Sequence, residues 1–152
     1  MFTTFQSAWD DFLRPMFQRP RRVQVAALCY RKTKSGGKKV LLVTSRGTGR
    51  WIIPKGWPIP GKGSAQGAMQ EAWEEAGVTG RAKDSAIGSY TYDKTHEGGW
   101  AEPIEAAVYP VKVDAVADEF PECAERRRRW VSPQEAANLV DEPELKDILR
   151  EL

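Results

Sequence analysis

The sequence predicts an α+β fold in which helices flank a mixed β-sheet. Short β-rich runs recur between Gly-rich turns, whereas helical periodicity is confined to one central segment and the two ends of the chain. The regular alternation of strand and helix that a purely parallel sheet requires is missing. With 152 residues, 41% of them hydrophobic and 29% charged, the composition is typical of one globular domain covering residues 1–152.

The first 20 residues predict a short packing helix, with a lipid-surface or partner-binding role as the alternative. In this segment, large apolar side chains recur at helical spacing: Phe5, Trp9, Phe12 and Met16. The segment lacks the basic start and unbroken apolar core of an export signal, and every apolar run in the chain is too short to span a membrane. The two cysteines, Cys29 and Cys123, indicate neither a disulfide framework nor a zinc site. We therefore expect a cytoplasmic protein without a membrane partner.

Six β-rich runs predict strands. They lie at residues 23–30, 39–45, 50–54, 86–93, 104–113 and 127–131. The first two are joined by the polar turn SGGKK, and the fourth and fifth by a Gly-rich loop that contains His96, the single histidine. We expect His96 to be a loop residue rather than a catalyst.

Three further segments predict helices. Ser64 is a favourable N-cap and Gly77 a favourable stop for a helix over residues 64–76. Its predicted core-facing side consists of Ala65, Ala68, Met69, Ala72, Trp73 and Ala76. Pro133 and Pro143 each stand at a predicted first helical position, and the last helix is expected to end at Leu152.

The loop over residues 56–63 (GWPIPGKG) nearly matches G-x-x-x-x-G-K-[ST], the loop that wraps nucleotide phosphates. However, Gly63 stands where the magnesium-binding Ser or Thr belongs. Pro58 and Pro60 lie inside the loop, and proline has no N–H to donate to a phosphate oxygen. The match is therefore rejected, and Lys62 requires a different explanation.

The predicted central helix carries three closely spaced carboxylates, Glu71, Glu74 and Glu75. Residues three and four apart share a helix face, so these like charges repel one another, and the negative end of the helix dipole adds to the cost. Mg²⁺ or Mn²⁺, which prefer oxygen ligands, would relieve that repulsion. The alternative is a solvated acidic surface, and spacing alone does not decide between the two.

The whole stretch over residues 56–78 resembles the Nudix box, G-x5-E-x7-R-E-U-x-E-E-x-G-U, in which U is aliphatic. The positions that agree are Gly56, Glu71, Ala72, Glu74, Glu75, Gly77 and Val78. The flanking W-x-x-P-K-G is also typical of this family. Beyond the box, the resemblance extends to the branch of diphosphoinositol polyphosphate and diadenosine polyphosphate phosphohydrolases, in the segments RVQVAALCYR, LLVTSRGTGRW and RRRRWVSPQEA. The resemblance covers roughly residues 20–150 and implies a Nudix-like α/β/α sandwich.

This resemblance implies metal-dependent hydrolysis of a phosphoanhydride bond in a nucleoside-diphosphate-linked or polyphosphorylated substrate, such as a dinucleoside polyphosphate or an inositol pyrophosphate. It implies that Glu71, Glu74 and Glu75 form the catalytic set and hold Mg²⁺, for which Mn²⁺ is a substitute. The number of metal ions and the general base stay open. Besides Glu71, the candidates for a proton-accepting glutamate are Glu102, Glu105 and Glu122.

Basic groups are expected to bind the substrate phosphates. The residues expected to bind substrate are Arg22, Arg46, Arg50, Lys55, Gly56, Lys62, Arg127 and Arg129. In a strand, Arg127 and Arg129 face one side while Arg126 and Arg128 face the other, so at most half of this run can line one pocket. A solvated or RNA-attracting basic edge is the alternative for the run. Its lack of interleaved aromatic residues argues against nucleic acid as a partner.

Two positions depart from the Nudix box. Lys62 replaces a glutamate that lies near the metal in the family, and Gln70 replaces an arginine that holds the loop to the helix. A protonated Lys62 does not ligate a metal but is a candidate phosphate contact, and neutral Gln70 can hydrogen-bond without repelling it. These departures support a second hypothesis, a catalytically weakened Nudix domain that acts as a nucleotide-binding sensor or regulator. The sequence specifies neither the substrate nor an oligomeric state.

Overall fold

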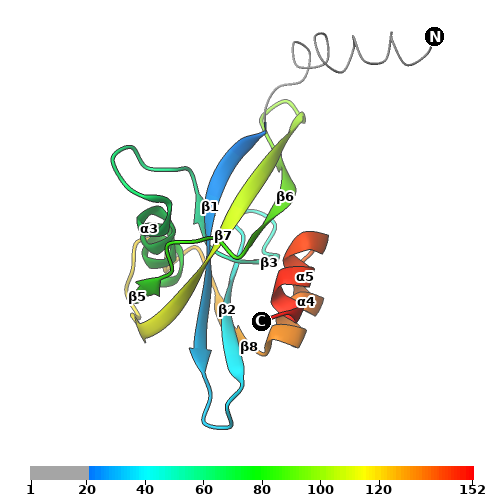
Figure 1. The fold of residues 1–152 in the computed structure, drawn as a ribbon. Coiled ribbons are helices and arrows are strands. Elements are labelled where there is room, and N and C mark those ends of the chain that lie inside the picture. Colours follow the sequence, from blue (N-terminus) through cyan, green and yellow to red (C-terminus); the bar gives the residue numbers. More distant parts are fainter. Residues whose placement is uncertain (1–20) are drawn as a thin grey trace, which may run out of the picture.

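The computed structural model describes residues 21–152, so the helix expected within residues 1–20 lies outside the described part. Eight strands form one mixed sheet, with helices on both of its faces (Figure 1). The strands are β1 (Arg22–Lys32), β2 (Lys38–Thr44), β3 (Trp51–Ile52), β4 (Lys55–Gly56), β5 (Val78–Ala82), β6 (Gly88–Thr95), β7 (Ala101–Val116) and β8 (Arg128–Val131). The helices are α3 (Ser64–Ala76), α4 (Pro133–Leu139) and α5 (Pro143–Arg150). The predicted α+β architecture is confirmed.

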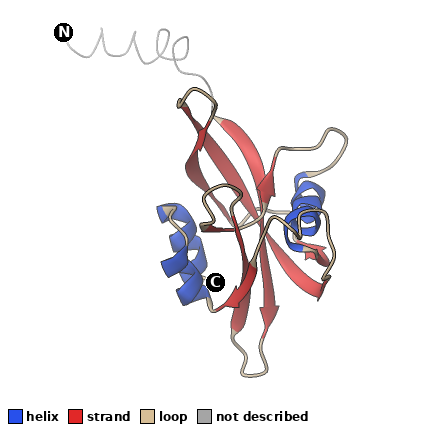
Figure 2. Ribbon diagram, turned by 180° about the vertical axis from the view of Figure 1, so that it is seen from behind, coloured by secondary structure: helices blue, strands red, loops and turns tan. Residues whose placement is uncertain are grey.

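The sheet is built around β1 and β7. The main path runs β3-β2-β1-β7-β5, while β4 pairs with β1, β6 with β7 and β8 with β2. Strands β1 and β7 are parallel, and the other pairs are antiparallel. Figure 2 shows, from behind, α3 on one face and the α4–α5 pair on the other.

Strand β1 is apolar without interruption because both of its faces are covered. Val25, Ala27 and Cys29 pack in the cluster beneath α3, which also contains Ala68, Ala72 and Ala76 of that helix. The alternate residues Ala26 and Leu28 pack in the second cluster, beneath α4 and α5. Both cysteines are free, Cys29 buried and Cys123 exposed.

Helix α3 has the predicted bounds but differs from prediction at two positions. Gly63 rather than Ser64 is the N-cap, and its N–H donates to Gln66 Oε1 at 3.2 Å. Gly77 ends the helix as predicted. Its φ of 68° is in the left-handed region, which glycine adopts without a steric penalty. Trp73, predicted to face the core, is 38% exposed, because a narrow row of alanines lets α3 lie close to the sheet.

The remaining differences concern two strands that were not predicted, β4 and β5, and the ends of other elements; the strand expected at 50–54 covers only Trp51–Ile52. Strand β5 was not predicted, because VTGRA is short, polar and interrupted by Gly80; it forms by pairing with β7, with a register shift between Thr79 and Gly80. Strand β7 extends over Ala101–Val116, beyond the predicted 104–113. Helix α5 ends at Arg150 rather than Leu152. Pairing with neighbouring strands, rather than local propensity, sets the limits of the strands.

Candidate active site

Gly56 allows the carboxyl group of Glu71 to lie directly against β4. A Cβ atom at position 56 would collide with Cδ and both carboxyl oxygens of Glu71. Strand β4 is fixed in this place by its pairing with β1, where Gly56 lies opposite Val25. Glu71 can therefore occupy this place only because position 56 is a glycine.

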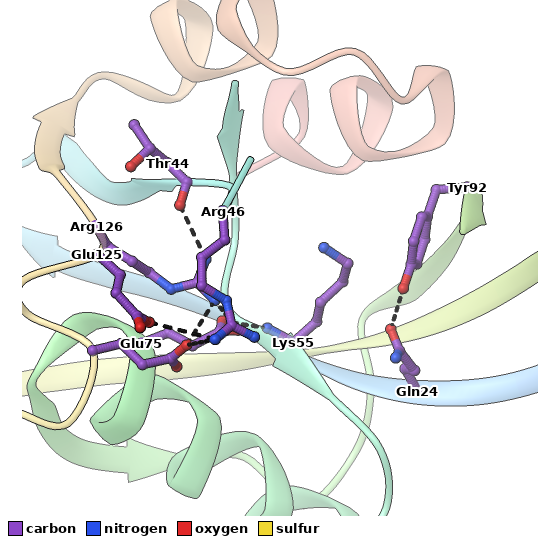
Figure 3. A network of polar contacts seen from close by, with 9 residues as sticks. Gln24, Thr44, Arg46, Lys55, Glu75, Tyr92, Glu125 and Arg126 are labelled. Carbon is purple, nitrogen blue, oxygen red and sulfur yellow. Dashed lines mark hydrogen bonds and ion pairs between the residues drawn. The ribbon is translucent and has the colours of Figure 1, made fainter. Parts of the chain in front are cut away.

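Glu75 is buried and held from two directions. The N–H of Lys55 donates to its Oε2 at 2.9 Å, and Arg126 Nη2 donates to its Oε1 at 2.9 Å. Only 8% of the Glu75 side chain and 4% of the Arg126 side chain are exposed. Figure 3 shows Glu75 and Arg126 together on one side of Lys55, with the hydrogen-bonded Tyr92 and Gln24 on its other side.

Arg126 was not among the residues predicted to bind substrate, yet it is the arginine that reaches the carboxylates. Its Nη1 donates to the carbonyl oxygen of Thr44 at 3.0 Å, and its Nη2 also contacts Glu122 at 3.2 Å. Its Nε is buried and has no partner within the described chain. Of the three glutamates considered outside the box, Glu122 is the one at this site. Strand alternation alone could not have selected Arg126, since its environment depends on how β8 pairs.

A pocket of about 470 Å³ adjoins the Glu75–Arg126 pair, and we call it the arginine pocket. Arg46, Arg126 and Arg127 contribute to its walls, together with the loop that follows β2. Arg46 is exposed and lies 3.2 Å from Glu122 and 3.4 Å from Glu125. The pocket therefore gathers two of the predicted substrate-binding arginines beside the buried glutamate.

The pKa values of two carboxyl groups at this site, Glu71 and Glu75, are raised. Burial raises the pKa of Glu71 to about 7, and the charges of Glu75, Glu74 and Glu122 add to this effect. Burial likewise raises the pKa of Glu75, against the opposing influence of Arg126. Glu71 accepts no side-chain hydrogen bond from any residue in 21–152, in contrast to Glu75. Burial and the neighbouring glutamates thus disfavour the ionised form of Glu71 more than Arg126 favours it.

Lys62 and Gln70 form a chain of hydrogen bonds that leads to Glu74. Lys62 Nζ donates to Gln70 Oε1 at 2.6 Å, and Gln70 Nε2 donates to Glu74 Oε1 at 3.0 Å. The lysine cation requires the amide oxygen of Gln70 to face it, which leaves the amide N–H groups for Glu74. The two departures from the Nudix box are therefore coupled to each other and to one of its carboxylates.

The predicted metal ligands have suitable chemistry but are not assembled into a centre. In the described part of the chain, no group of three or more His, Cys, Asp or Glu side chains is arranged to hold a metal ion. Carboxylate oxygens are the donors that Mg²⁺ and Mn²⁺ prefer. Each oxygen of Glu75 accepts one hydrogen bond and retains a second lone pair, and Glu71 packs into the space at Gly56 that a side chain would otherwise fill. The donor set therefore fits a divalent cation.

Lys55 and Arg50 lie on the α4–α5 side of the sheet. Lys55 Nζ is 4.7 Å from the centre of the Tyr92 ring, and burial lowers the pKa of this lysine. Arg50 Nη1 donates to Glu142 Oε1 at 2.6 Å, so its charge is balanced at the start of α5. The other oxygen of Glu142 is buried without a partner within residues 21–152. Of these two cations, Arg50 is paired with a carboxylate and Lys55 is not, within the described chain.

The other arginines have structural partners. Arg22 pairs with Glu102, and this contact lowers the pKa of that carboxyl to about 2, which argues against Glu102 as a general base. Arg129 pairs with Glu135 of α4 at 2.7 Å, on the opposite face from α3. Arg128 donates to the carbonyl oxygens of Ala76 and Ala117 at 2.9 and 2.8 Å. The arginine run is thus divided between internal contacts and surface pairs. Arg126 and Arg127, predicted to face opposite sides of a strand, both precede β8 and both line the arginine pocket.

Residues 20–152 match the sequence model of the NUDIX domain. The chain belongs to the Nudix family. Among curated proteins it is similar to "Nudix hydrolase 21, chloroplastic" of Arabidopsis thaliana, with 31% identity over 137 residues, covering 84% of this chain and 64% of that protein. It is also similar to human "Diphosphoinositol polyphosphate phosphohydrolase 3-beta", with 27% identity over 121 residues, covering 77% of this chain and 68% of that protein.

Solved Nudix structures share the fold. A C. elegans Ap4A hydrolase superimposes with a TM-score of 0.64 at 22% identity, covering 87% of this chain and 96% of that chain. The NUDIX domain of Shewanella oneidensis NrtR, complexed with ADP ribose, gives a TM-score of 0.60 at 16% identity, covering 96% of both chains. The predicted Nudix-like sandwich is confirmed by these likenesses.

Cellular location stays a prediction. No helix within residues 21–152 is both long enough and apolar enough to cross a membrane. Two of the similar plant proteins are named as chloroplastic and mitochondrial, so relatives of this chain occur outside the cytoplasm. The chain spans less than two thirds of the length of each of these two relatives, 64% in both cases.

The buried ion pair between Glu75 and Arg126 leads to a first testable prediction, which concerns stability. Replacing Arg126 by methionine should lower the free energy of unfolding by about 3 kcal/mol, because Glu75 would remain buried without its partner. Arg129→Met is the matched control: its pair with Glu135 is about half exposed, and its loss should cost at most about 1 kcal/mol. Urea denaturation measures both, and equal losses would contradict this account.

The raised pKa of Glu71 leads to a second prediction, which concerns how stability depends on pH. Its folded pKa of about 7 lies above its ordinary value of 4.5, so between these pH values the folded chain binds more protons than the unfolded chain. The free energy of unfolding of the metal-free protein should therefore fall as pH rises through this window. Thermal melting in EDTA from pH 4.5 to 8 should show this, with a smaller slope for Glu71→Gln. An unchanged slope in that variant would show that Glu71 is not responsible.

Proposed function

We propose that this protein hydrolyses a phosphoanhydride bond in a nucleoside-diphosphate-linked or polyphosphorylated substrate, with Mg²⁺ or Mn²⁺ as the cofactor. The observation that carries the proposal is the Glu71 carboxyl group, which lies against Gly56, close enough to Glu74 and Glu75 for their charges to raise its pKa. A solvated acidic surface does not explain a glutamate that is accommodated only because a glycine faces it. Membership of the Nudix family supports the same chemistry.

In this proposal, Glu71, Glu74 and Glu75 would hold the metal. When bound, the metal ion neutralises phosphate charge and lowers the pKa of its bound water. Arg126 and the N–H of Lys55 keep Glu75 in one orientation, so that its remaining lone pairs face a fixed direction. Glu71, whose oxygens are otherwise free within the described chain, is the proposed proton acceptor.

The substrate phosphates are proposed to contact Lys55 and the arginine pocket. Lys55 contributes a cation with no bound carboxylate, and Arg46 and Arg127 line the 470 Å³ pocket beside Glu75. Arg50 and Arg129, which were also predicted to bind substrate, are each paired with a glutamate in this structure. The relatives named as diphosphoinositol polyphosphate phosphohydrolases and Ap4A hydrolases support a polyphosphorylated substrate.

A substrate panel tests the proposal. Phosphate or pyrophosphate release should be measured with dinucleoside polyphosphates, nucleotide sugars, nucleotides and inositol pyrophosphates, in Mg²⁺, in Mn²⁺ and in EDTA. We expect metal-dependent turnover of at least one of them and a loss of about 100-fold or more in kcat for Glu75→Gln. Glu135→Gln, which alters an exposed carboxylate on α4, serves as the control. If no substrate is turned over in a metal-dependent way, or if Glu75→Gln is as active as wild type, the proposed enzymatic activity is refuted.

The chain of hydrogen bonds from Lys62 to Glu74 supports the second candidate, a weakened domain that senses or regulates by binding a nucleotide. Lys62→Glu distinguishes roles for this lysine. If Lys62 binds a substrate phosphate, KM should rise, by about 10-fold for loss of one charged contact, with kcat unchanged. If Lys62 only replaces a metal-site glutamate, kcat should be kept or increase. Gln70→Arg combined with Lys62→Glu restores the family's residues at both positions and tests whether the two sites are coupled.

A further inference from the structure

The hairpin that joins β1 to β2 is strongly basic and lies away from the candidate active site. We call residues 31–39 (RKTKSGGKK) the basic hairpin. Its cations are Arg31, Lys32, Lys34, Lys38 and Lys39. Arg31 is six residues beyond Val25, the partner of Gly56, which corresponds to about 20 Å along a strand. In Figure 1 this hairpin extends beyond the other strands at the lower end of the sheet. The proposed hydrolysis uses none of its residues.

The basic hairpin is a ribbon of two strands with no other described strand beside it. The pairing of β1 with β7 ends at Tyr30, opposite Lys112. The pairing of β2 with β8 begins at Val40, opposite Val131. Beyond these positions β1 and β2 pair only with each other. From Tyr30 to the turn at Thr33 the ribbon rises by three residues, or about 10 Å.

Both cross-strand pairs of the ribbon bring like charges together. Arg31 lies directly opposite Lys39, and Lys32 lies directly opposite Lys38. Like charges in directly opposed positions destabilise a sheet. Lysines on exposed strands also hinder pairing with other chains, but that protection requires neither an arginine nor directly opposed cations. The arrangement therefore has a cost that protection of the strand edges does not explain.

The described chain does not balance these charges. None of the five cations of the basic hairpin forms an ion pair within residues 21–152. The sequence contains no acidic residue at positions 12–70. By contrast, Arg22, Arg50 and Arg129 are each paired with a glutamate. An anionic partner would relieve the repulsion within the ribbon.

The cations are divided between the two faces of the ribbon. Side chains alternate along a strand, so Arg31 is on the α3 side of the sheet, as Cys29 is. Lys39 is directly opposite Arg31 and shares that face. Lys32 and Lys38 are on the α4–α5 side. Each face of the ribbon therefore presents one directly opposed pair of cations.

An aromatic ring supports one cation on each face. The guanidinium of Arg31 lies 4.1 Å from the centre of the Trp130 ring, and Lys38 Nζ lies 5.6 Å from the centre of the Tyr30 ring. Trp130 packs against the cluster beneath α3, and Tyr30 packs against the cluster beneath α4 and α5. Because both rings belong to the body of the protein, these cation–π contacts restrain the two cations at the base of the ribbon.

The shape and charge of the basic hairpin match the major groove of B-form DNA. This groove is about 12 Å wide and about 8.5 Å deep, and it admits a two-stranded β-ribbon. The rise of about 10 Å from Tyr30 to the turn is close to the depth of the groove. Phosphates border the groove on both sides, as the cations lie on both faces of the ribbon. A flat anionic membrane would not contact both faces at once.

We propose that the basic hairpin binds duplex DNA by entering its major groove, with the cations of each face on the phosphates of one groove wall. The binding is independent of sequence, because phosphate contacts carry no information about the bases. This inference does not rest on the proposed hydrolysis. The expectation that nucleic acid is not a partner came from the arginine run at 126–129, a different set of residues, and the inference departs from it.

Fluorescence anisotropy of the full chain with a labelled 20-base-pair DNA duplex, between 50 and 200 mM NaCl, tests the proposal. Four phosphate contacts predict a slope of log K against log salt of about −3.6, which weakens binding about 150-fold over this range. Lys32→Gln combined with Lys39→Gln removes one cation from each face, and the slope should fall to about −1.8. Lys32→Arg combined with Lys39→Arg keeps the charges and should keep the wild-type slope.

Arg21→Gln combined with Lys94→Gln is the matched control. It changes the net charge by the same amount, but Arg21 directly precedes β1 and Lys94 pairs with Glu102, so both lie at the opposite end of the sheet. Its slope should equal that of wild type. Thermal melting verifies folding, and Lys32→Gln combined with Lys39→Gln should be at least as stable as wild type, because it removes both like-charge pairs.

Two further ligands distinguish the partners. A duplex RNA of the same sequence has a deep, narrow major groove and should bind more weakly than the DNA. Vesicles of phosphatidylserine and phosphatidylcholine present a flat anionic surface and should show no binding that depends on Lys32 and Lys39. In the substrate panel, kcat of Lys32→Gln combined with Lys39→Gln should equal that of wild type, so this test and that of the proposed function can fail separately.

Three outcomes overturn the inference. The first is no salt-dependent binding of duplex DNA, or equal slopes for wild type and for Lys32→Gln combined with Lys39→Gln. The second is equal affinity for the RNA and DNA duplexes, which excludes entry into the major groove. The third is vesicle binding that depends on these lysines without binding of DNA, which assigns the hairpin to lipid headgroups.

Discussion

The buried ion pair between Glu75 and Arg126 is the interaction on which the arrangement of the candidate site depends. Glu75 belongs to α3 and Arg126 precedes β8, and the N–H of Lys55 adds β4 to the same carboxylate. Arg126 also donates to the carbonyl oxygen of Thr44, the last residue of β2. Because a buried charge is strongly destabilising without its partner, these contacts are kept together. One carboxylate thus fixes the relative positions of several elements that are distant in sequence.

The same group of arginines offsets the negative end of α3. A helix C-terminus leaves carbonyl groups without intrahelical partners and carries a partial negative charge, to which Glu71, Glu74 and Glu75 add. Arg128 donates to the carbonyl oxygen of Ala76, and Arg126 neutralises Glu75. Glu71, against a glycine that gives it room, has no such hydrogen-bonded cation within the described chain, and its pKa is raised to about 7. The fold therefore makes ionisation of Glu71 costly, and in the proposed chemistry a bound cation would lower that cost.

The two departures from the Nudix box have a local physical explanation. In the hydrogen bonds from Lys62 through Gln70 to Glu74, the lysine sets the orientation of the amide, and the amide donates to the carboxylate. An arginine at position 70 would place two cations side by side. The loop and the helix are thus still joined by polar contacts, although the charged residue has moved from the helix to the loop.

Local patterns determined most of the fold and part of the site. Gly77 ended α3, Pro133 and Pro143 began α4 and α5, and the spacing of Glu71, Glu74 and Glu75 placed them on one helix face, because caps and periodicity act over a few residues. Only the tertiary structure decided which arginine meets Glu75. Strand alternation placed Arg126 on the same side as Arg128. The choice of Arg126 depended on the pairing of β8 with β2, after which Arg126 reaches Glu75, 51 positions away in the sequence. Strand β5 and the exposure of Trp73 were missed for the same reason: each depends on which part of the folded chain packs against it.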